Sequence, residues 1–266
     1  MKYIYPKLPG AYTFPFFRIG GNGLANCLFV YAKAIVIAHR YGAKIIKPTW
    51  FNLSLGTYLR QEKDKRHYRN LIISQGEITG LKRLFTLFFK HKTTFEETFA
   101  NNQCSVLVVE GIYDFFKPLL GYQNLVSDYI IKHINPSLLF DVNKFDFKGC
   151  VAIHVRLGDF PMERRVPIKW YIEKIKGLNN YSRFLLFSDG SNEELKEILN
   201  IQGVQRVYFG GAIQDIIAIS RCSYIIGSDS SFSAWGAYLG QVPCTFYRLQ
   251  FGQILVNPDM QQIENL

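Results

Sequence analysis

Short apolar runs alternate with amphipathic stretches along the second half of the chain, and this pattern predicts its fold. The apolar runs are typical of buried strands and cover residues 150–155, 184–187, 206–209, 224–226 and 244–247. Between them, apolar residues at helical spacing predict helices near residues 168–178, 193–199, 213–221 and 232–239, and Ser191 and Glu194 have the spacing of a capping box. Such alternation predicts a parallel sheet that is covered by helices on both faces.

The first half is patterned less regularly. It predicts strands at residues 14–19, 43–47 and 105–109, a helix near residues 26–41 after a glycine-rich turn, and a second helix over residues 81–90. Residues 52–69 are polar and predict loops, and the pattern lapses again across residues 135–149. We therefore expect an α/β protein of two Rossmann-type lobes with parallel sheets and a cleft between them, divided into residues 1–148 and 149–266.

Three polar segments follow predicted strands of the second half. They comprise His154, Arg156, Gly158 and Asp159 after the first strand, Ser188, Asp189 and Gly190 after the second, and Gly227, Ser228, Asp229, Ser230 and Ser231 after the fourth. Parallel sheets bind ligands at the carboxyl ends of their strands. We therefore expect the three segments to share one edge of the sheet.

This edge has the chemistry of a diphosphate site. The last segment opens a predicted helix, whose unpaired N–H groups and positive dipole end attract anions. The hydroxyl groups of Ser228, Ser230 and Ser231 can cap the helix and also bind phosphate oxygens. Arg156 can add a charge-assisted, bidentate contact to the same phosphate.

The same residues have a purely structural interpretation. The serines can be helix caps, His154 can be a core histidine with its hydrogen bonds satisfied, and Arg156 can form an ion pair with Asp159. The coincidence of three polar segments at one sheet edge favours a binding site.

Composition narrows the cellular context and the partners. The formal net charge of +10 attracts anionic partners, but the basic residues are spread along the chain, which argues against a nucleic-acid-binding block. No apolar run is long enough to span a bilayer, and the first 15 residues lack the apolar stretch of a secretory signal. The five cysteines are scattered without a Cys-x-x-Cys pair, so we expect reduced thiols and a cytoplasmic location.

Several motifs resemble those of a known family. Residues 154–159, His-Val-Arg-Leu-Gly-Asp, resemble the His-x-Arg-Arg-x-Asp motif of the α-1,2-fucosyltransferases (glycosyltransferase family 11) and of their α-1,6 and protein O-fucosylating relatives. Residues 224–239 are similar to the late motif of the family, and Phe187-Ser188-Asp189 matches its Phe-Ser-Asp element. Asp215 and residues 219–222 resemble its Asp, Met-Ser, Cys spacing, and residues 22–32 resemble its glycine-rich opening. The sequence departs from the family at Leu157, where a second arginine is usual, and at Ala25, Cys27 and Ala234.

The resemblance implies a GT-B fold and transfer of L-fucose from GDP-fucose to a glycan hydroxyl in an α-1,2 linkage, with inversion and without a metal cofactor. It implies that the donor is bound by His154, Arg156, Ser188, Asp189, Ser228, Ser230, Ser231 and Phe232. It further implies catalytic roles for Arg156, Asp159 and Glu163, and an acceptor-side loop that contains Gly23 and Asn26. The residues agree on the metal, because the chain has no Asp-x-Asp pair to hold one on a diphosphate and no zinc-type histidine pairing.

Parts of the sequence also fit other functions. The segment Gly21-x-Gly23-x-x-Asn26 suggests a Rossmann dehydrogenase, but the third glycine is absent and residues 44–47 end in lysine where an acid is expected. Two alternatives stay open: the same fold acting on another nucleotide sugar, and a basic nucleic-acid-binding protein rich in Tyr and Phe.

Residues 81–92 combine bulky apolar side chains with flanking cations. The favoured interpretation is a core helix of the first lobe, with Leu81, Leu84, Phe85 and Phe88 as its buried face. Weak, reversible contact with the inner face of a membrane is the alternative hypothesis, because further apolar residues stand beside the cations.

Overall fold

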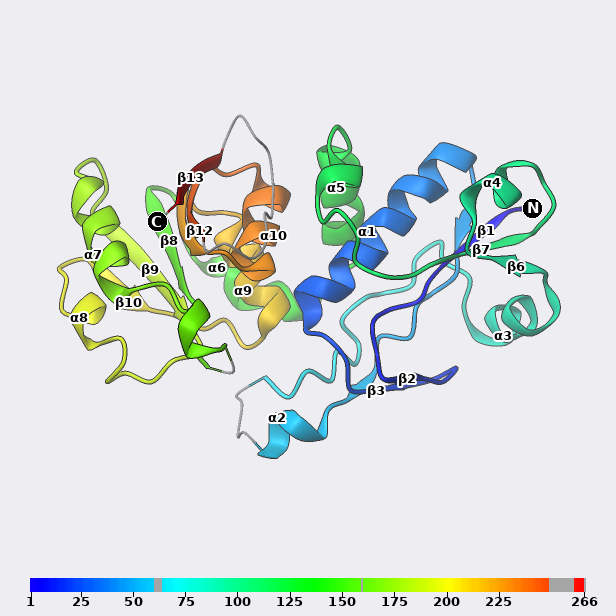
Figure 1. The fold of residues 1–266 in the computed structure, drawn as a ribbon, viewed down its shortest axis with the longest axis horizontal. Helices are drawn as coiled ribbons and strands as arrows, with labels where there is room; N and C mark the ends of the chain where they lie inside the picture. Colours follow the sequence, from blue (N-terminus) through cyan, green and yellow to red (C-terminus); the bar gives the residue numbers. More distant parts are fainter. Residues whose placement is uncertain (60–63, 159, 249–260, 266) are drawn as a thin grey trace. The chain divides into compact units, whose positions relative to one another are not determined.

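Two units, each built on a parallel sheet, make up the chain: Met1–Leu138 and Leu139–Leu266 (Figure 1). The computed structural model describes residues 1–59, 64–158, 160–248 and 261–265. The predicted α/β class with parallel sheets is confirmed. The predicted boundary after residue 148 falls inside the second unit, just before its first strand.

The first unit contains a four-stranded parallel sheet in the order β4-β1-β7-β6. Its strands are β1 (Tyr3–Pro6), β4 (Lys44–Ile45), β6 (Lys92–Thr93) and β7 (Val106–Val109). A second, three-stranded sheet consists of β2 (Tyr12–Thr13), β3 (Arg18–Ile19) and β5 (Asn52–Leu53). The helices are α1 (Leu24–Tyr41), α2 (Leu55–Leu59), α3 (Gly80–Phe89), α4 (Glu96–Ala100), α5 (Gln123–His133) and the 3₁₀ turns η1 (Lys117–Leu119) and η2 (Pro136–Leu139).

The prediction of a strand over residues 14–19 was wrong for most of that segment. The first strand of the main sheet is β1, and only Arg18–Ile19 of the predicted segment is extended and paired. The Phe14 N–H instead bonds the Phe17 carbonyl at 2.8 Å, and Pro15 has no N–H to contribute to a ladder. The segment therefore turns back on itself before β3.

The glycine-rich turn before α1 is held by close backbone approach. Gly21 has φ +92°, and a Cβ at this position would lie 2.5 Å from the Pro9 carbonyl oxygen. The fully buried Arg18 donates hydrogen bonds to that same carbonyl and, at 3.5 Å, to Cys27 Sγ on α1. Arg18 thus ties the turn to the helix that follows it.

Helix α3 shows the opposite orientation to the one predicted. Of the four residues predicted to be buried, Leu81, Phe85 and Phe88 are 85%, 57% and 68% exposed and Leu84 is half-buried, whereas Arg83 and Thr86 are buried. The Arg83 guanidinium bonds acceptors in two distant segments, and this outweighs the burial of the apolar stripe. The predicted core face of this helix is therefore wrong.

The second unit contains a six-stranded, all-parallel sheet in the order β10-β9-β8-β11-β12-β13. The strands are β8 (Cys150–Val155), β9 (Arg183–Ser188), β10 (Val204–Arg206), β11 (Tyr224–Ser228), β12 (Cys244–Arg248) and β13 (Gln261–Asn265). The helices are α6 (Phe140–Lys144), α7 (Ile168–Gly177), α8 (Lys196–Leu199), α9 (Ala212–Ile219), α10 (Ser231–Gly240) and the 3₁₀ turn η3 (Met162–Arg164). All five predicted strands are present, with β10 displaced by about two residues; β13 was not predicted.

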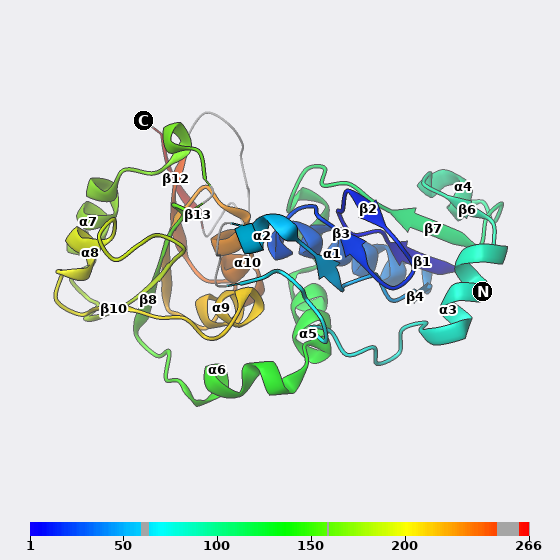
Figure 2. The same ribbon diagram turned by 90° about the horizontal axis from the view of Figure 1, so that it is seen from below.

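Helices cover both faces of this sheet, as predicted. Helices α7 and α8 pack on one face, where Tyr171 and Leu195 are fully buried, and α9 and α10 lie on the other (Figures 1 and 2). Close approach of α9 to α10 requires Gly236, because a Cβ there would lie 2.3 Å from the side chain of Ile219. The predicted capping box is also confirmed: the Ser191 N–H bonds Glu194 at 2.8 Å and the Glu194 N–H bonds Ser191 at 3.2 Å.

Across the described ranges, none of the helices combines the length and the apolarity that crossing a bilayer would need.

Candidate functional site

Three neighbouring strands of the second unit bring the predicted polar segments to one edge. Strand β8 pairs in parallel with β9 on one side and with β11 on the other, with His154 opposite both Phe187 and Gly227. The loops that follow β8, β9 and β11 therefore leave the sheet side by side. The chain proceeds from β8 to β9 and β10 in one direction and then returns to β11 in the other, which makes the β8–β11 junction a topological switch point.

An ion pair joins the first two of these loops. Arg156 Nη1 lies 2.5 Å from Asp189 Oδ2, and Asp189 Oδ1 accepts a hydrogen bond from the Leu157 N–H at 2.8 Å. Both side chains keep about a third of their surface exposed, 28% and 32%. Asp189 is thus a partner of Arg156. Asp159, the partner that the sequence suggested, lies outside the described residues.

Glycine is required where these two loops touch. A Cβ on Gly158 would lie 2.5 Å from Asp189 Oδ2, and a Cβ on Gly190 would lie 2.5 Å from the Leu157 side chain. Side chains at either position would push the loops apart and lengthen the Arg156–Asp189 pair.

Two further arginines, neither of them predicted from the sequence, hold the loops by their backbones. Arg206, at the end of β10, donates to the carbonyls of Gly190 at 2.6 Å and Ser188 at 3.2 Å. Arg165 donates to the carbonyls of Phe160 at 3.1 Å and Gly158 at 3.2 Å. No sequence motif predicts such bonds between a side chain and a carbonyl, because the acceptors are ordinary peptide groups. For Arg206 they are also 16 and 18 positions away in the sequence.

The third loop leads into the N-terminus of α10. Ser230 is the N-cap, and its Oγ accepts a hydrogen bond from the Phe232 N–H at 3.3 Å. Ser230, Ser231 and Phe232 are each partly exposed, whereas Ser228 is only 2% exposed. The first turn of α10 therefore presents its partial positive charge at the same edge as Arg156.

His154 is buried beneath this helix start. Its Nδ1 lies 3.1 Å from Ser233 Oγ and 3.5 Å from Ser228 Oγ, and its ring stacks on Phe232 with centroids 5.0 Å apart. Burial lowers the pKa of His154 to about 4, and the positive charge of Arg156 acts in the same direction. His154 is therefore neutral near pH 7 and ties β8 to the start of α10.

Gly227 makes this packing possible. A Cβ on Gly227 would lie 2.5 Å from the Phe246 ring and 2.8 Å from Ser233 Oγ. The glycine in the third segment thus serves the contact between β11, β12 and the helix start.

Most of the second unit and the end of the first resemble a known protein family. Residues 126–246 match the family model of glycosyl transferase family 11. The matched segment includes β8, β9, β11 and the three loops at their carboxyl ends. The match covers less than half of the chain. Over these residues it confirms the resemblance that the motifs indicated, and with it the expectation of a glycosyltransferase. No curated protein sequence matches the chain.

The fold of the chain is shared with solved structures. It resembles the NodZ α-1,6-fucosyltransferase co-crystallised with GDP, with a TM-score of 0.57 and 12% identity over 91% of this chain and 93% of that one. It also resembles fucosyltransferase NodZ from Bradyrhizobium, with a TM-score of 0.57 and 13% identity over 91% of this chain and 94% of that one. For a variant of FUT1 from Arabidopsis thaliana in complex with GDP, the TM-score is 0.57 and the identity 12%, over 94% of this chain and 71% of that one. At such low identities the likeness concerns the fold.

The remaining predicted residues lie elsewhere. Glu163 is exposed on η3, which follows the β8 loop. Gly23 and Asn26 belong to the first unit, where Gly23 is the N-cap of α1 and its carbonyl accepts from the Asn26 N–H at 3.1 Å. Within the described part of the chain, no three His, Cys, Asp or Glu residues are grouped as a metal site requires.

The buried histidine predicts a loss of stability at acid pH. Because the pKa of His154 is lowered from 6.5 to about 4, the unfolded chain binds a proton between these values while the folded chain does not. This group therefore does not affect the free energy of unfolding well above pH 6.5, and it lowers that free energy as the pH falls toward 4, by about 2 kcal/mol at pH 5. Urea unfolding of wild type and His154→Gln at several pH values measures this. We expect a shallower fall for the variant; parallel curves would contradict the assignment.

Proposed function

We propose that this glycosyltransferase transfers L-fucose from GDP-fucose to a hydroxyl of a glycan acceptor, in an α-1,2 linkage and with inversion at the anomeric carbon. The observation that carries the proposal is that Arg156 and the N-terminus of α10 follow two strands, β8 and β11, which pair in parallel at the switch point of the sheet. The fold likeness to fucosyltransferases, two of them solved with GDP, supports the choice of donor. The residue motifs support the linkage.

The donor diphosphate would bind between Arg156 and the first turn of α10. A guanidinium has five N–H donors in a planar fork, so Arg156 can keep Asp189 as a partner and still contact a phosphate. Ser230 and Ser231 stand at the helix start, where N–H groups favour anions. Asp189, Arg206 and Arg165 would act as positioning residues, because they fix the loops and do not need to touch the donor.

In the reaction, the bond between the anomeric carbon and the β-phosphate oxygen breaks as the acceptor oxygen attacks from the opposite face. Negative charge then develops on the leaving GDP, and Arg156 and the α10 dipole would stabilise it. The acceptor hydroxyl loses its proton to a carboxylate, for which we propose Glu163 or Asp159. The first unit, with Gly23 and Asn26, would hold the acceptor.

The proposed place of action is the cytoplasm. None of the five cysteines forms a disulfide, and four of them, Cys27, Cys150, Cys222 and Cys244, are buried. Buried thiols of this kind are stable in a reducing compartment.

The phosphate role predicts a large effect of a conservative change. Arg156→Lys keeps the charge but loses the fork, so we expect turnover of GDP-fucose to fall by more than ~100-fold. Arg183→Lys is the matched control, because Arg183 opens β9 at the opposite edge of the same sheet. Steady-state kinetics measure both variants, with circular dichroism to verify folding. Near-normal turnover of a folded Arg156→Lys enzyme would rule this role out.

A second prediction concerns the metal. If Arg156 and the α10 dipole supply the positive charge for the diphosphate, turnover should be unchanged in excess EDTA and should not rise with added Mg²⁺ or Mn²⁺. Loss of activity on chelation, restored by either ion, would show that a metal performs this task.

A third prediction separates the two candidate bases. Glu163→Gln removes the proton acceptor but keeps the shape of the side chain, so kcat should fall by about 100-fold or more while GDP affinity is unchanged. Asp159→Asn tests the alternative, and Glu173→Gln on the exposed side of α7 is the control. An unchanged kcat in Glu163→Gln would exclude Glu163.

A further inference from the structure

The orientation of α3 is set from inside the first unit. Arg83 is 7% exposed and donates to the Lys47 carbonyl at 2.7 Å, the Pro15 carbonyl at 2.5 Å and Thr49 Oγ1 at 2.8 Å. Rolling the helix would break these bonds and leave buried acceptors without their donor, which is unfavourable. The helix therefore cannot roll to bury its apolar side, and the exposed side is a fixed feature of the fold.

That exposed side is strongly apolar. Leu81, Phe85, Phe88 and Phe89 are 85%, 57%, 68% and 73% exposed, and the rings of Phe85 and Phe89 lie 4.9 Å apart. Phe95, the N-cap residue of α4, adds a fifth apolar side chain at 72% exposure. We call these five residues the α3 face; soluble proteins seldom expose so many bulky apolar groups together without a partner.

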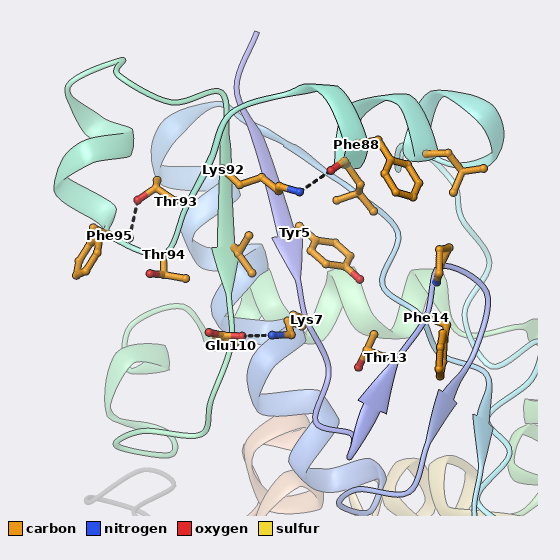
Figure 3. Close-up of a pocket in the computed structure, with 14 residues that line it drawn as sticks. Tyr5, Lys7, Thr13, Phe14, Phe88, Lys92, Thr93, Thr94, Phe95 and Glu110 are labelled. Carbon is orange, nitrogen blue, oxygen red and sulfur yellow. Dashed lines mark hydrogen bonds and ion pairs between the residues drawn. The ribbon is translucent and has the colours of Figure 1, made fainter.

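The α3 face continues into a pocket of about 610 Å³ (Figure 3). Its lining includes the aromatic side chains Phe14, Phe88 and Phe95 and the aliphatic side chains Leu84 and Leu87. The pocket follows the carboxyl ends of β1, β6 and β7. The apolar surface thus has depth and can admit part of an amphiphile.

Cations surround the α3 face. Lys82, Lys90 and Lys92 are all exposed, and residues 79–94 contain no Asp or Glu. Lys92 also donates to the Leu87 carbonyl at 2.7 Å and so fixes the end of the helix. Apolar side chains of α3 bordered by lysines are complementary to a lipid surface with anionic headgroups. Of the acids that flank this segment, Glu77 is buried and Glu96 pairs with Arg40 at 2.9 Å, whereas Glu97 is exposed on α4. A second copy of the chain fits poorly, because a symmetric contact would bring the same lysines together.

We propose that the α3 face binds the surface of an anionic membrane. The aromatic side chains insert at the level of the headgroups, and Lys82 and Lys90 lie over the phosphates. The protein thereby associates reversibly, without a spanning segment. This binding is independent of the donor site in the second unit, so vesicle binding and sugar transfer can fail separately.

Vesicle co-sedimentation of the full chain tests the proposal. We expect binding to vesicles of phosphatidylglycerol and phosphatidylcholine at low salt, weaker binding at moderate salt, and little binding to phosphatidylcholine alone. Phe85→Ser/Phe89→Ser should reduce affinity at least tenfold. Lys82→Gln/Lys90→Gln should reduce it by about 25-fold, roughly fivefold for each cation. Arg83 is left unchanged in every variant, because it holds the helix in place.

The matched control is Leu55→Ser/Leu59→Ser. These two residues have the same i, i+4 spacing on α2 of the same unit and are 75% and 85% exposed. The control should bind vesicles like wild type. No binding at low salt, or an equal loss in the control and in Phe85→Ser/Phe89→Ser, would overturn the proposal. So would a dimer in analytical ultracentrifugation that Phe85→Ser/Phe89→Ser dissociates, because the face would then be covered by a second copy.

Discussion

The fully buried strand β8 determines where every group of the candidate donor site lies. All six of its residues are buried, and it pairs in parallel with β9 and β11 on its two sides. Parallel pairing leaves the following loops at a single edge, and the reversal of strand order at β8 separates their helices there. The Arg156–Asp189 pair, the start of α10 and His154 all follow from this position.

The candidate site has a buried part, in which His154 bonds to serines, and a partly exposed part, which contains the Arg156–Asp189 pair. His154 is neutral and bonded to two serines, so it connects sheet and helix without placing a second positive charge beside Arg156. Above it, Asp189 holds Arg156, and Arg206 and Arg165 hold the loop backbones. Preorganised donors of this kind lose little energy to reorientation when charge develops on a leaving group.

The sequence was most informative where the periodicity of the chain and the physics of the sheet agree. Continuous apolar runs predict buried parallel strands, and the segment 150–155 coincides with β8 to the residue. The position of the three polar loops could be predicted as well, because parallel strand direction alone brings them to one edge of the sheet. The pairing of Arg156 with Asp189 did not follow, because the two residues are 33 positions apart and Asp159 offers the same charge much nearer.

Other features depend on contacts that leave no pattern. Arg206 and Arg165 bind peptide carbonyls, which every residue possesses. In α3 the hydrophobic periodicity predicted the wrong face, because one buried arginine with acceptors in distant segments decided the orientation. Strand β1 is only four residues long and ends at a proline, so its apolar run is too short to be distinctive.

The central claim is that the edge formed by β8, β9 and β11 binds a guanosine-diphosphate sugar. Isothermal titration of the protein with GDP-fucose, GDP-mannose, GDP, UDP and UDP-galactose tests it most directly. The account predicts saturable one-to-one binding of the GDP compounds, at least tenfold tighter than the UDP compounds, with GDP-fucose tighter than GDP-mannose. Equal affinity for both nucleotides, or no saturable binding of GDP-fucose, would contradict it.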